Sequence, residues 1–268
     1  MHETGAIEAS SHKVLTVATP DGKLSPALVR PCVDGHHGEH MVKPRLVYIS
    51  NSTEWGTVYS AEELQALGGF CRDHGLLLYV DGARLASALT TDGNDVDLAL
   101  LAGQADAFYI GGTKNGALLG EALVIVNPVL RTDFRHIIKQ RGAMLAKGMV
   151  VGAQFEALFE DGLYFVLATH ANAMAARLRE ILQRAGVPLA VDSPSNQVFP
   201  VLPDAMVERL RSFVEFETWE RRGDGTTVIR LMTSWATPES DIEAFAATFT
   251  ALYTEGRAVG AAQQAQGA

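Results

Sequence analysis

Short apolar runs that alternate with helical patterns constrain this chain more than any other feature of its sequence. Residues 76–80 form a continuous apolar run of strand length, as expected of a strand buried on both faces. Residues 45–50, 106–110 and 122–126 are further candidate strands. Because helical patterns lie between these runs, the order predicts a mostly parallel sheet covered by helices.

The first of these helical patterns carries a capping signal. Ser60 is followed three residues later by Glu63, and this spacing is typical of a capping box at a helix N-terminus. Apolar residues then recur at helical spacing through Phe70, and the pattern ends near His74-Gly75. A second helical pattern covers residues 96–102.

The second half of the chain has a different organisation. A long helical pattern over residues 162–185 precedes three short predicted strands, with a helix before the second strand and another after the third. The predicted strands cover residues 197–202, 213–218 and 227–233, and the helices cover 204–211 and the segment that opens at Thr237-Pro238-Glu239. We therefore expect a partial large domain over 1–150, a linking helix and small α+β domain over 151–255, and a flexible tail over 256–268.

The net charge and the two cysteines indicate which binding partners and which cellular compartment to expect. The formal net charge of −9 argues against nucleic acid or an anionic membrane as a partner. The sequence has no apolar run long enough to cross a bilayer and no recognisable signal peptide. Its two cysteines, Cys32 and Cys71, form neither a metal-binding pattern nor a disulfide framework, which fits a reducing cytoplasm.

Asp81 is the first candidate for chemistry, because it directly follows the apolar run at residues 76–80. A carboxylate at this point lies at the carboxyl edge of the sheet, where α/β proteins bind ligands. Its burial is unfavourable unless the charge is paired. Taken alone, an aspartate before Gly82-Ala83-Arg84 is more typical of a helix N-cap.

Lys114 is the second candidate and lies in the loop Gly111-Gly112-Thr113-Lys114-Asn115-Gly116, after the predicted strand at 106–110. Glycines let a ligand approach the backbone, and a desolvated lysine at a strand end can have a nucleophilic amine. A solvated loop lysine is the common alternative. The loop lacks the order of a phosphate-binding loop, which disfavours a nucleoside triphosphatase.

Asp81 and Lys114 are more informative together than alone, because they lie at the ends of successive predicted strands. An amine and a carboxylate placed this way suit pyridoxal phosphate (PLP). The lysine forms a Schiff base with the cofactor, and the carboxylate holds the pyridinium proton so that the ring can accept electrons. Such a carboxylate–pyridinium contact is a charge-assisted hydrogen bond.

Several segments, taken in order, resemble the threonine aldolase and aromatic β-eliminating lyase family, whose members are fold-type I PLP enzymes. The resemblance extends to about Tyr253. The segments are Val80-Asp81-Gly82-Ala83-Arg84, Gly112-Thr113-Lys114-Asn115-Gly116, His2-Glu3-Thr4-Gly5-Ala6-Ile7-Glu8, Asp21-Gly22-Lys23-Leu24, Gln154-Phe155-Glu156-Ala157-Leu158 and Ile229-Arg230-Leu231-Met232-Thr233-Ser234-Trp235.

The resemblance implies a role for each matching residue. Lys114 would be the cofactor lysine, and Asp81 the partner of the ring nitrogen. Arg84 and Arg230 would bind the carboxylate of an amino-acid substrate, since a guanidinium fits a carboxylate in two parallel hydrogen bonds; a surface arginine is the alternative for Arg230. Glu54 stands where many aldolases carry a histidine near the substrate hydroxyl, and is either the base or a solvated turn residue.

The resemblance also implies the reaction and the assembly. We expect a PLP-dependent lyase that cleaves the Cα–Cβ bond of a β-hydroxy-α-amino acid, such as threonine to glycine and acetaldehyde, in a homodimer or homotetramer. The alternatives are β-elimination or transamination on the same scaffold, and a non-catalytic truncated paralogue. The family's phosphate-binding turn and stacking histidine are expected upstream of Glu3-Thr4-Gly5, so we expect the chain to lack an N-terminal part. His2 is too close to Glu3 to be that histidine.

Overall fold

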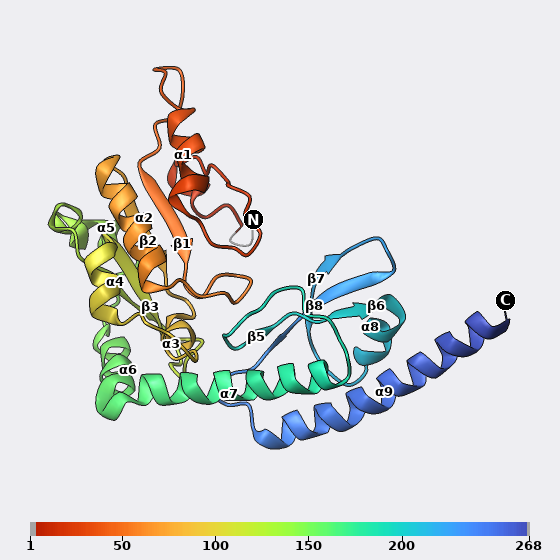
Figure 1. The fold of residues 1–268 in the computed structure, drawn as a ribbon. Coiled ribbons are helices and arrows are strands. Elements are labelled where there is room, and N and C mark those ends of the chain that lie inside the picture. The colour runs from red at the N-terminus through yellow and green to blue at the C-terminus, as the bar shows by residue number, and fades with distance from the viewer. Residues whose placement is uncertain (1–3, 267–268) are drawn as a thin grey trace.

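The computed structural model describes the backbone of residues 4–266 and the side chains through residue 253. His2 and Glu3, which belong to one of the family-like segments, lie outside the described residues. The α-helices and strands of the first half are shown in Figure 1. They are α1 (Pro26–Asp34), β1 (Leu46–Ser50), α2 (Ala61–Asp73), β2 (Leu77–Asp81), α3 (Leu85–Leu89), α4 (Leu98–Gln104), β3 (Ala107–Gly111), β4 (Glu121–Ile125), α5 (Phe134–Gln140) and α6 (Met149–Phe159).

Strands β1 to β4 form the first sheet, in the order β1-β2-β3-β4. The pairs β1–β2 and β2–β3 are parallel, and β4 runs antiparallel to β3. The expectation of a mostly parallel sheet in an α/β fold is thereby confirmed. Since β1, β2 and β3 run in the same direction, their carboxyl ends share one edge of the sheet, and the loops that follow them meet there.

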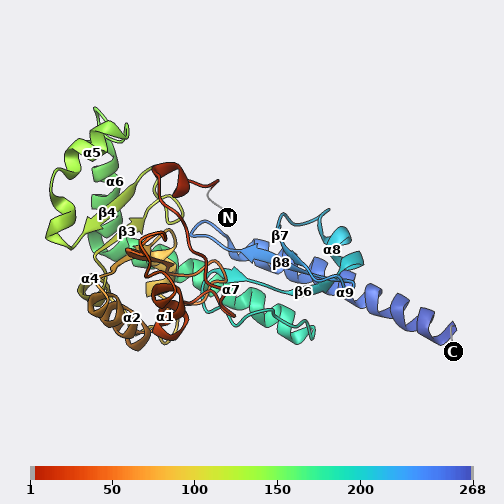
Figure 2. The same ribbon diagram turned by 90° about the horizontal axis from the view of Figure 1, so that it is seen from above.

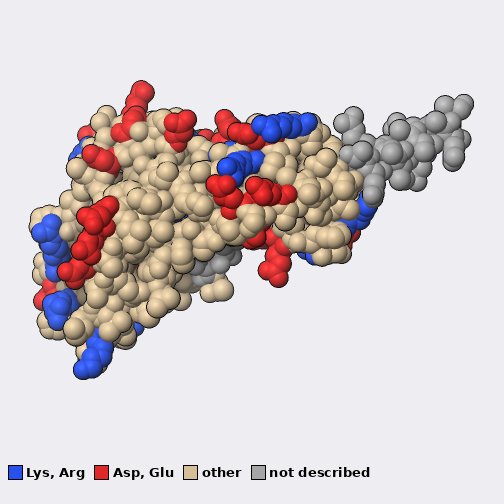
Figure 3. Space-filling view, turned by 90° about the horizontal axis from the view of Figure 1, so that it is seen from below, with Lys and Arg blue, Asp and Glu red and all other residues tan. Residues whose placement is uncertain are grey.

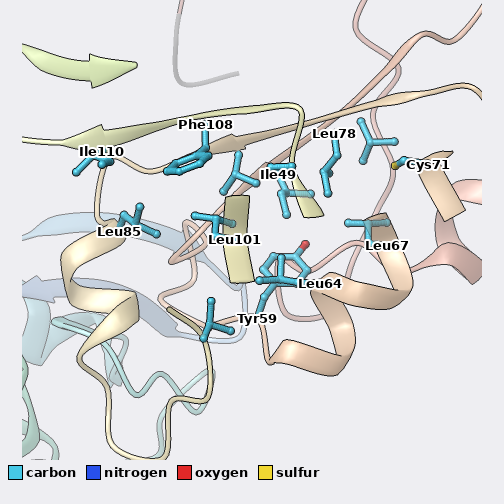
Figure 4. Packing of buried hydrophobic residues seen from close by; sticks show 14 of the residues in the cluster. Ile49, Tyr59, Leu64, Leu67, Cys71, Leu78, Leu85, Leu101, Phe108 and Ile110 are labelled. Atoms are coloured by element: carbon cyan, nitrogen blue, oxygen red, sulfur yellow. The ribbon is translucent and has the colours of Figure 1, made fainter. Parts of the chain in front are cut away.

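Helix α2 covers one face of this sheet, and its N-terminus has the predicted cap. The Ser60 hydroxyl accepts a hydrogen bond from the Glu63 amide, while the Glu63 carboxylate accepts one from the Ser60 amide, so the capping box is complete. Leu64 and Leu67 on this helix are fully buried and pack with Leu78 of β2 in the first hydrophobic core (Figure 4). The capping box thus fixes the N-terminus of α2, whose apolar side chains form part of the first hydrophobic core.

The expectation that the strand at residues 76–80 is buried on both faces is wrong for the described chain. Along β2, fully buried residues alternate with partly buried ones. The buried set points to α2 and α4, whereas the opposite face of the sheet carries Leu46, Tyr48 and Leu123, each more than a third exposed. A continuous apolar run does not report which face of a strand is covered, because that depends on what packs against the sheet.

The second half contains the long helix that was expected, followed by a small sheet (Figure 1). Its elements are α7 (Leu163–Arg184), β5 (Gln197–Val198), β6 (Val201–Pro203), α8 (Asp204–Leu210), β7 (Glu217–Arg221), β8 (Thr226–Met232) and α9 (Glu239–Gln266). Strands β5, β6 and β7 all pair antiparallel with β8. Helix α7 lies beside the small sheet and extends back to the first half (Figures 1 and 2).

Two strand predictions in this half need correction. The predicted strand at 197–202 is divided into β5 and β6, because Pro200 lies between them and has no amide hydrogen to donate. The strand predicted at 213–218 begins only at Glu217. The amides of Phe213 and Val214 instead bond to the Leu210 carbonyl and form a turn after α8.

The described part of the chain has two large hydrophobic cores and a small third cluster of Phe199, Val201 and Val228. The first includes residues up to Ala168 of α7, and the second begins with Met174 of the same helix. The domain boundaries expected near residues 150 and 255 stay predictions. Helix α9 continues through Gln266, across most of the segment expected to be a tail, and residues 267 and 268 lie outside the described part. None of the helices in the described part has the length and hydrophobicity needed to cross a membrane.

Candidate active site

The structure brings Asp81 and Lys114 to the same edge of the first sheet. Asp81 is the last residue of β2, and Lys114 lies three residues beyond the end of the neighbouring strand β3. Lys114 and Arg84 line one small pocket together with Ser87, Asn115 and Asn196. Their joint position, which the sequence indicated only through spacing, follows from the parallel pairing of β2 with β3.

Asp81 is held by three hydrogen-bond donors. The Tyr109 hydroxyl and the Ala83 amide, at 3.0 Å, donate to Oδ1, and the Tyr48 hydroxyl donates to Oδ2. Helix α3 has Arg84 at its N-cap position without a side-chain cap, so Asp81 is not the N-cap of this helix. The N-cap alternative for Asp81 is therefore wrong, and its carboxylate accepts two hydrogen bonds from neutral tyrosine hydroxyls and one from a backbone amide.

Glu121 of β4 holds the loop that carries Lys114. Its carboxylate accepts hydrogen bonds from the Gly112 amide at 2.5 Å and from the Thr113 hydroxyl at 2.8 Å. On the other side of Lys114, the Asn115 side chain donates to the Tyr164 carbonyl at 2.8 Å. The loop is thus fixed on both sides of the lysine.

The Lys114 amine has no hydrogen bond or ion pair among the described residues. Desolvation by the surrounding protein lowers the pKa of Lys114, although the side chain keeps access to solvent. The positive charge of Arg84 lowers the pKa further, whereas Glu54, Asp81 and Glu121 act in the opposite direction. A lowered pKa increases the fraction of neutral amine, which is the nucleophilic form.

Arg84, Arg230 and Glu54 form a charge cluster that joins the two halves of the chain. The Glu54 carboxylate lies 3.8 Å from Nη1 of Arg84 and 3.3 Å from Nη1 of Arg230. Both arginine side chains are about nine-tenths buried, at 10% and 11% exposure, while Glu54 is 47% exposed. The two guanidinium groups that were expected to bind a substrate carboxylate therefore share a carboxylate of the protein itself.

Arg230 has further partners that the sequence did not reveal. Its Nη2 atom pairs with Glu217 of β7, its Nη1 atom donates to Gln197 at 3.3 Å, and its guanidinium lies over the Trp219 ring. The surface-arginine alternative for Arg230 is therefore wrong. Glu217 and Gln197 could not have been found from sequence spacing, since β5 and β7 meet Arg230 only through their pairing with β8.

Gly82 and Gly111 lie where two backbone segments approach each other closely. A Cβ atom at Gly82 would lie 1.8 Å from the Tyr109 carbonyl oxygen, and one at Gly111 would lie 2.4 Å from the Ala83 carbonyl oxygen. Because backbone atoms cannot move aside easily, any side chain here would separate the two loops. These glycines keep the loop of Asp81 close to the strand that leads to Lys114.

Several buried polar atoms at this edge have no partner within the described residues. The Asn51 Nδ2 and Ser52 Oγ atoms lie just beyond β1, and the Asn51 amide donates to the Asp81 carbonyl at 2.9 Å. Buried polar groups without partners are uncommon and mark places where a ligand or water can bind. A nucleophilic amine, an anchored carboxylate and spare polar groups fit the aldehyde, ring nitrogen and polar substituents of PLP.

Known proteins resemble this chain over most of its length. Residues 1–205 match the family model described as beta-eliminating lyase. The low specificity L-threonine aldolase of Pseudomonas sp. (strain NCIMB 10558) is 36% identical over 93% of this chain and 72% of its own length. A solved structure of Leishmania major threonine aldolase is 49% identical, with a TM-score of 0.92, and the match covers 94% of this chain and 74% of that one.

A more distant solved structure defines the fold alone. Sphingomonas wittichii serine palmitoyltransferase is 16% identical with a TM-score of 0.61 over 88% of this chain and 60% of its own. The architecture is thus the α/β fold of fold-type I PLP enzymes. Within that class, the chain belongs to the beta-eliminating lyase family, a family of PLP-dependent lyases.

Proposed function

We propose that this protein is a PLP-dependent lyase that cleaves the Cα–Cβ bond of a β-hydroxy-α-amino acid, as in the conversion of threonine to glycine and acetaldehyde. The main support is the joint position of Lys114 and Asp81 at neighbouring strand ends, in a chain similar to threonine aldolases over more than nine-tenths of its length. The substrate class rests on those relatives.

Lys114 and Asp81 are the residues that would hold the cofactor. The Lys114 amine would hold the cofactor through its aldehyde, and the lowered pKa of this amine supports the role. The Asp81 carboxylate would accept a charge-assisted hydrogen bond from the protonated ring nitrogen. The chemistry that PLP supplies when bound is an electron sink for the pair released at Cα.

The substrate would be bound by Arg84 and Arg230, and Glu54 would act as the base. The two buried guanidinium groups bind and orient the substrate carboxylate. They do so at the position that the Glu54 carboxylate occupies in this structure. A substrate carboxylate must therefore displace Glu54 from at least one arginine. Released from that contact, the Glu54 carboxylate can accept the proton of the β-hydroxyl group, which must leave when the Cα–Cβ bond breaks.

A homodimer or homotetramer is part of the proposal. Leu118, four residues after Lys114, is 91% exposed, and Met149 and Val166 are 79% and 59% exposed. Seen from below, a broad region of the surface carries no Lys, Arg, Asp or Glu side chains (Figure 3). Large exposed apolar side chains such as Leu118, Met149 and Val166 are typical of contact regions between subunits. Light scattering that gives a monomer mass at micromolar concentration would contradict this part.

We also propose a cytoplasmic location. Cys32 and Cys71 are both free in the structure, and burial raises the pKa of the Cys71 thiol to about 11. A thiol with such a pKa is unreactive at neutral pH, and two free cysteines fit a reducing compartment. Fractionation of the producing cells would test the location directly.

The decisive test of the cofactor role is an absorbance titration with PLP. We expect a visible band that saturates in the wild type and is missing in Lys114→Ala. Lys139→Ala, which changes an exposed lysine of α5, is the matched control and should keep the band. A band that survives in Lys114→Ala, or no band in the wild type, would refute the assignment.

Product analysis then tests which bond is broken. We expect glycine and acetaldehyde from threonine. Formation of pyruvate from serine, of a free aromatic leaving group from an aromatic amino acid, or of an oxo acid from any of these would favour β-elimination or transamination. Cofactor binding without any product would favour the non-catalytic alternative.

A further inference from the structure

Three tyrosines lie side by side on the half-open face of the first sheet. Tyr48 of β1 is paired in register with Tyr79 of β2, and their rings stack with centroids 5.4 Å apart. Asp81 lies two residues beyond Tyr79 and so shares its face of the sheet. Tyr109 of β3 reaches Asp81 from the other side. The hydroxyls of Tyr48 and Tyr109 both donate to Asp81, whereas no hydrogen bond of the Tyr79 hydroxyl is found among the described residues.

The hydrogen bonds leave Asp81 with one acceptor position. A carboxylate offers roughly four lone-pair positions, two on each oxygen. Oδ1 accepts from Tyr109 and from the Ala83 amide, so both of its positions are used. Oδ2 accepts from Tyr48 and keeps one position. The carboxylate is therefore oriented, with a single place for one more donor.

The chemical nature of these donors matters as much as their number. Tyrosine hydroxyls are neutral, so they fix the carboxylate without cancelling its charge. No Lys, Arg or His nitrogen of the described residues forms an ion pair with Asp81 within 4.0 Å. Burial raises the pKa of Tyr109, and the hydrogen bond to Asp81 raises it further, so this hydroxyl stays protonated and keeps its donor role. A cation that binds to Asp81 thus meets an oriented carboxylate without a competing counter-ion.

We propose that Tyr48 and Tyr109 are positioning residues that orient the Asp81 carboxylate so that the remaining position on Oδ2 receives the protonated ring nitrogen of PLP. This inference rests on the proposed function. Both residues act through Asp81 and neither is a catalytic residue. A purely structural role, in which the hydroxyls only satisfy a partly buried carboxylate, makes a different prediction: their loss would destabilise the fold and leave the bound cofactor unchanged.

The test compares three variants that each remove a single hydroxyl. Tyr48→Phe and Tyr109→Phe remove a donor to Asp81, and Tyr79→Phe removes a hydroxyl on the same sheet face without such a bond. In an absorbance titration, each of the first two should raise the dissociation constant of PLP by roughly tenfold, the effect of losing one hydrogen bond to a charged group. They should also move the absorbance band or its pH dependence, and Tyr79→Phe should change the constant less than about twofold.

A double-mutant cycle separates action through Asp81 from a general effect on folding. In an Asp81→Asn background, Tyr109→Phe should weaken PLP binding by less than about twofold further, because the residue through which it acts is already altered. A full additional tenfold loss in that background would overturn the inference, as would unchanged binding and spectra in both single variants. Absence of a Lys114-dependent band in the wild type would overturn the proposed function, and the role of the tyrosines with it.

Discussion

The substitution Glu54→Gln distinguishes two roles that the geometry gives to Glu54. Its carboxylate lies between Arg84 and Arg230, at 3.8 Å and 3.3 Å from their Nη1 atoms, where a substrate carboxylate is expected to bind. As a base, Glu54 would accept the β-hydroxyl proton. As a counter-ion alone, it would only compete with the substrate for the two arginines. Glutamine keeps the size of the side chain and removes both the charge and the basicity.

The two roles predict effects of Glu54→Gln on the reaction rate that differ greatly in size. Removal of a positioned general base lowers the rate by roughly 100-fold to 10,000-fold. Glu54 is 47% exposed, so solvent screens its ion pairs and each contributes at most about 1 kcal/mol, or about fivefold in binding. We therefore expect Glu54→Gln to lower kcat at least about 100-fold. We expect KM to fall by no more than about fivefold, because the arginines become free for the substrate.

Steady-state cleavage of threonine, followed through acetaldehyde release, measures both parameters. Glu217→Gln is the matched control, because Glu217 pairs with Arg230 and has no ion pair with Arg84 among the described residues. It should leave kcat within about fivefold of the wild type and change KM by a similar factor. If Glu54→Gln also keeps kcat within about fivefold while KM falls, Glu54 is a counter-ion and its assignment as the base is wrong.

Three further predictions concern the sheet, the helix cap and the lysine. Leu78→Ala, at a fully buried position of β2, should lower the free energy of unfolding by about 2–5 kcal/mol in urea. Leu123→Ala, on the half-open face, should cost less than about 1 kcal/mol, and a cost as large as that of Leu78→Ala would contradict one-sided burial. Ser60→Ala removes half of the capping box and should destabilise the protein by about 1 kcal/mol, which chemical denaturation can measure; no change would mean that the cap does not form in solution. Arg84→Gln removes a positive charge that favours the neutral amine, so the pKa of Lys114 should rise and the cofactor band should form only at higher pH; a shift to lower pH would show that this electrostatic account is wrong.

Local features of the sequence predicted the strands that lead to Asp81 and Lys114. The apolar runs before Asp81 and Lys114 predicted the strands β2 and β3 to within one residue at each end. The spacing of Ser60 and Glu63 predicted the N-terminus of α2, including both of its hydrogen bonds. These signals are carried by residues that are close together in the chain, so they can be read without knowledge of the fold.

The sequence did not predict which side chains from different strands and sheets contact each other. Tyr48 and Tyr109 reach Asp81 from β1 and β3, over 33 and 28 residues of chain, and only the strand register brings them to the same face. Glu54 meets Arg230 over 176 residues, through the approach of the small sheet to the first one. Apolar periodicity does not specify such pairings, because register is set by the whole sheet.

The sequence by itself thus determined the class of fold and the positions of Asp81 and Lys114 at the ends of neighbouring strands, since strand ends, caps and glycine turns are encoded locally. The tertiary structure decided what surrounds them. It gave Asp81 three neutral donors and one remaining acceptor position, placed a protein carboxylate between the two arginines, and left one face of the sheet half open. The physical reason is that the environment of a side chain depends on which distant segments pack beside it, and packing is a property of the folded chain as a whole.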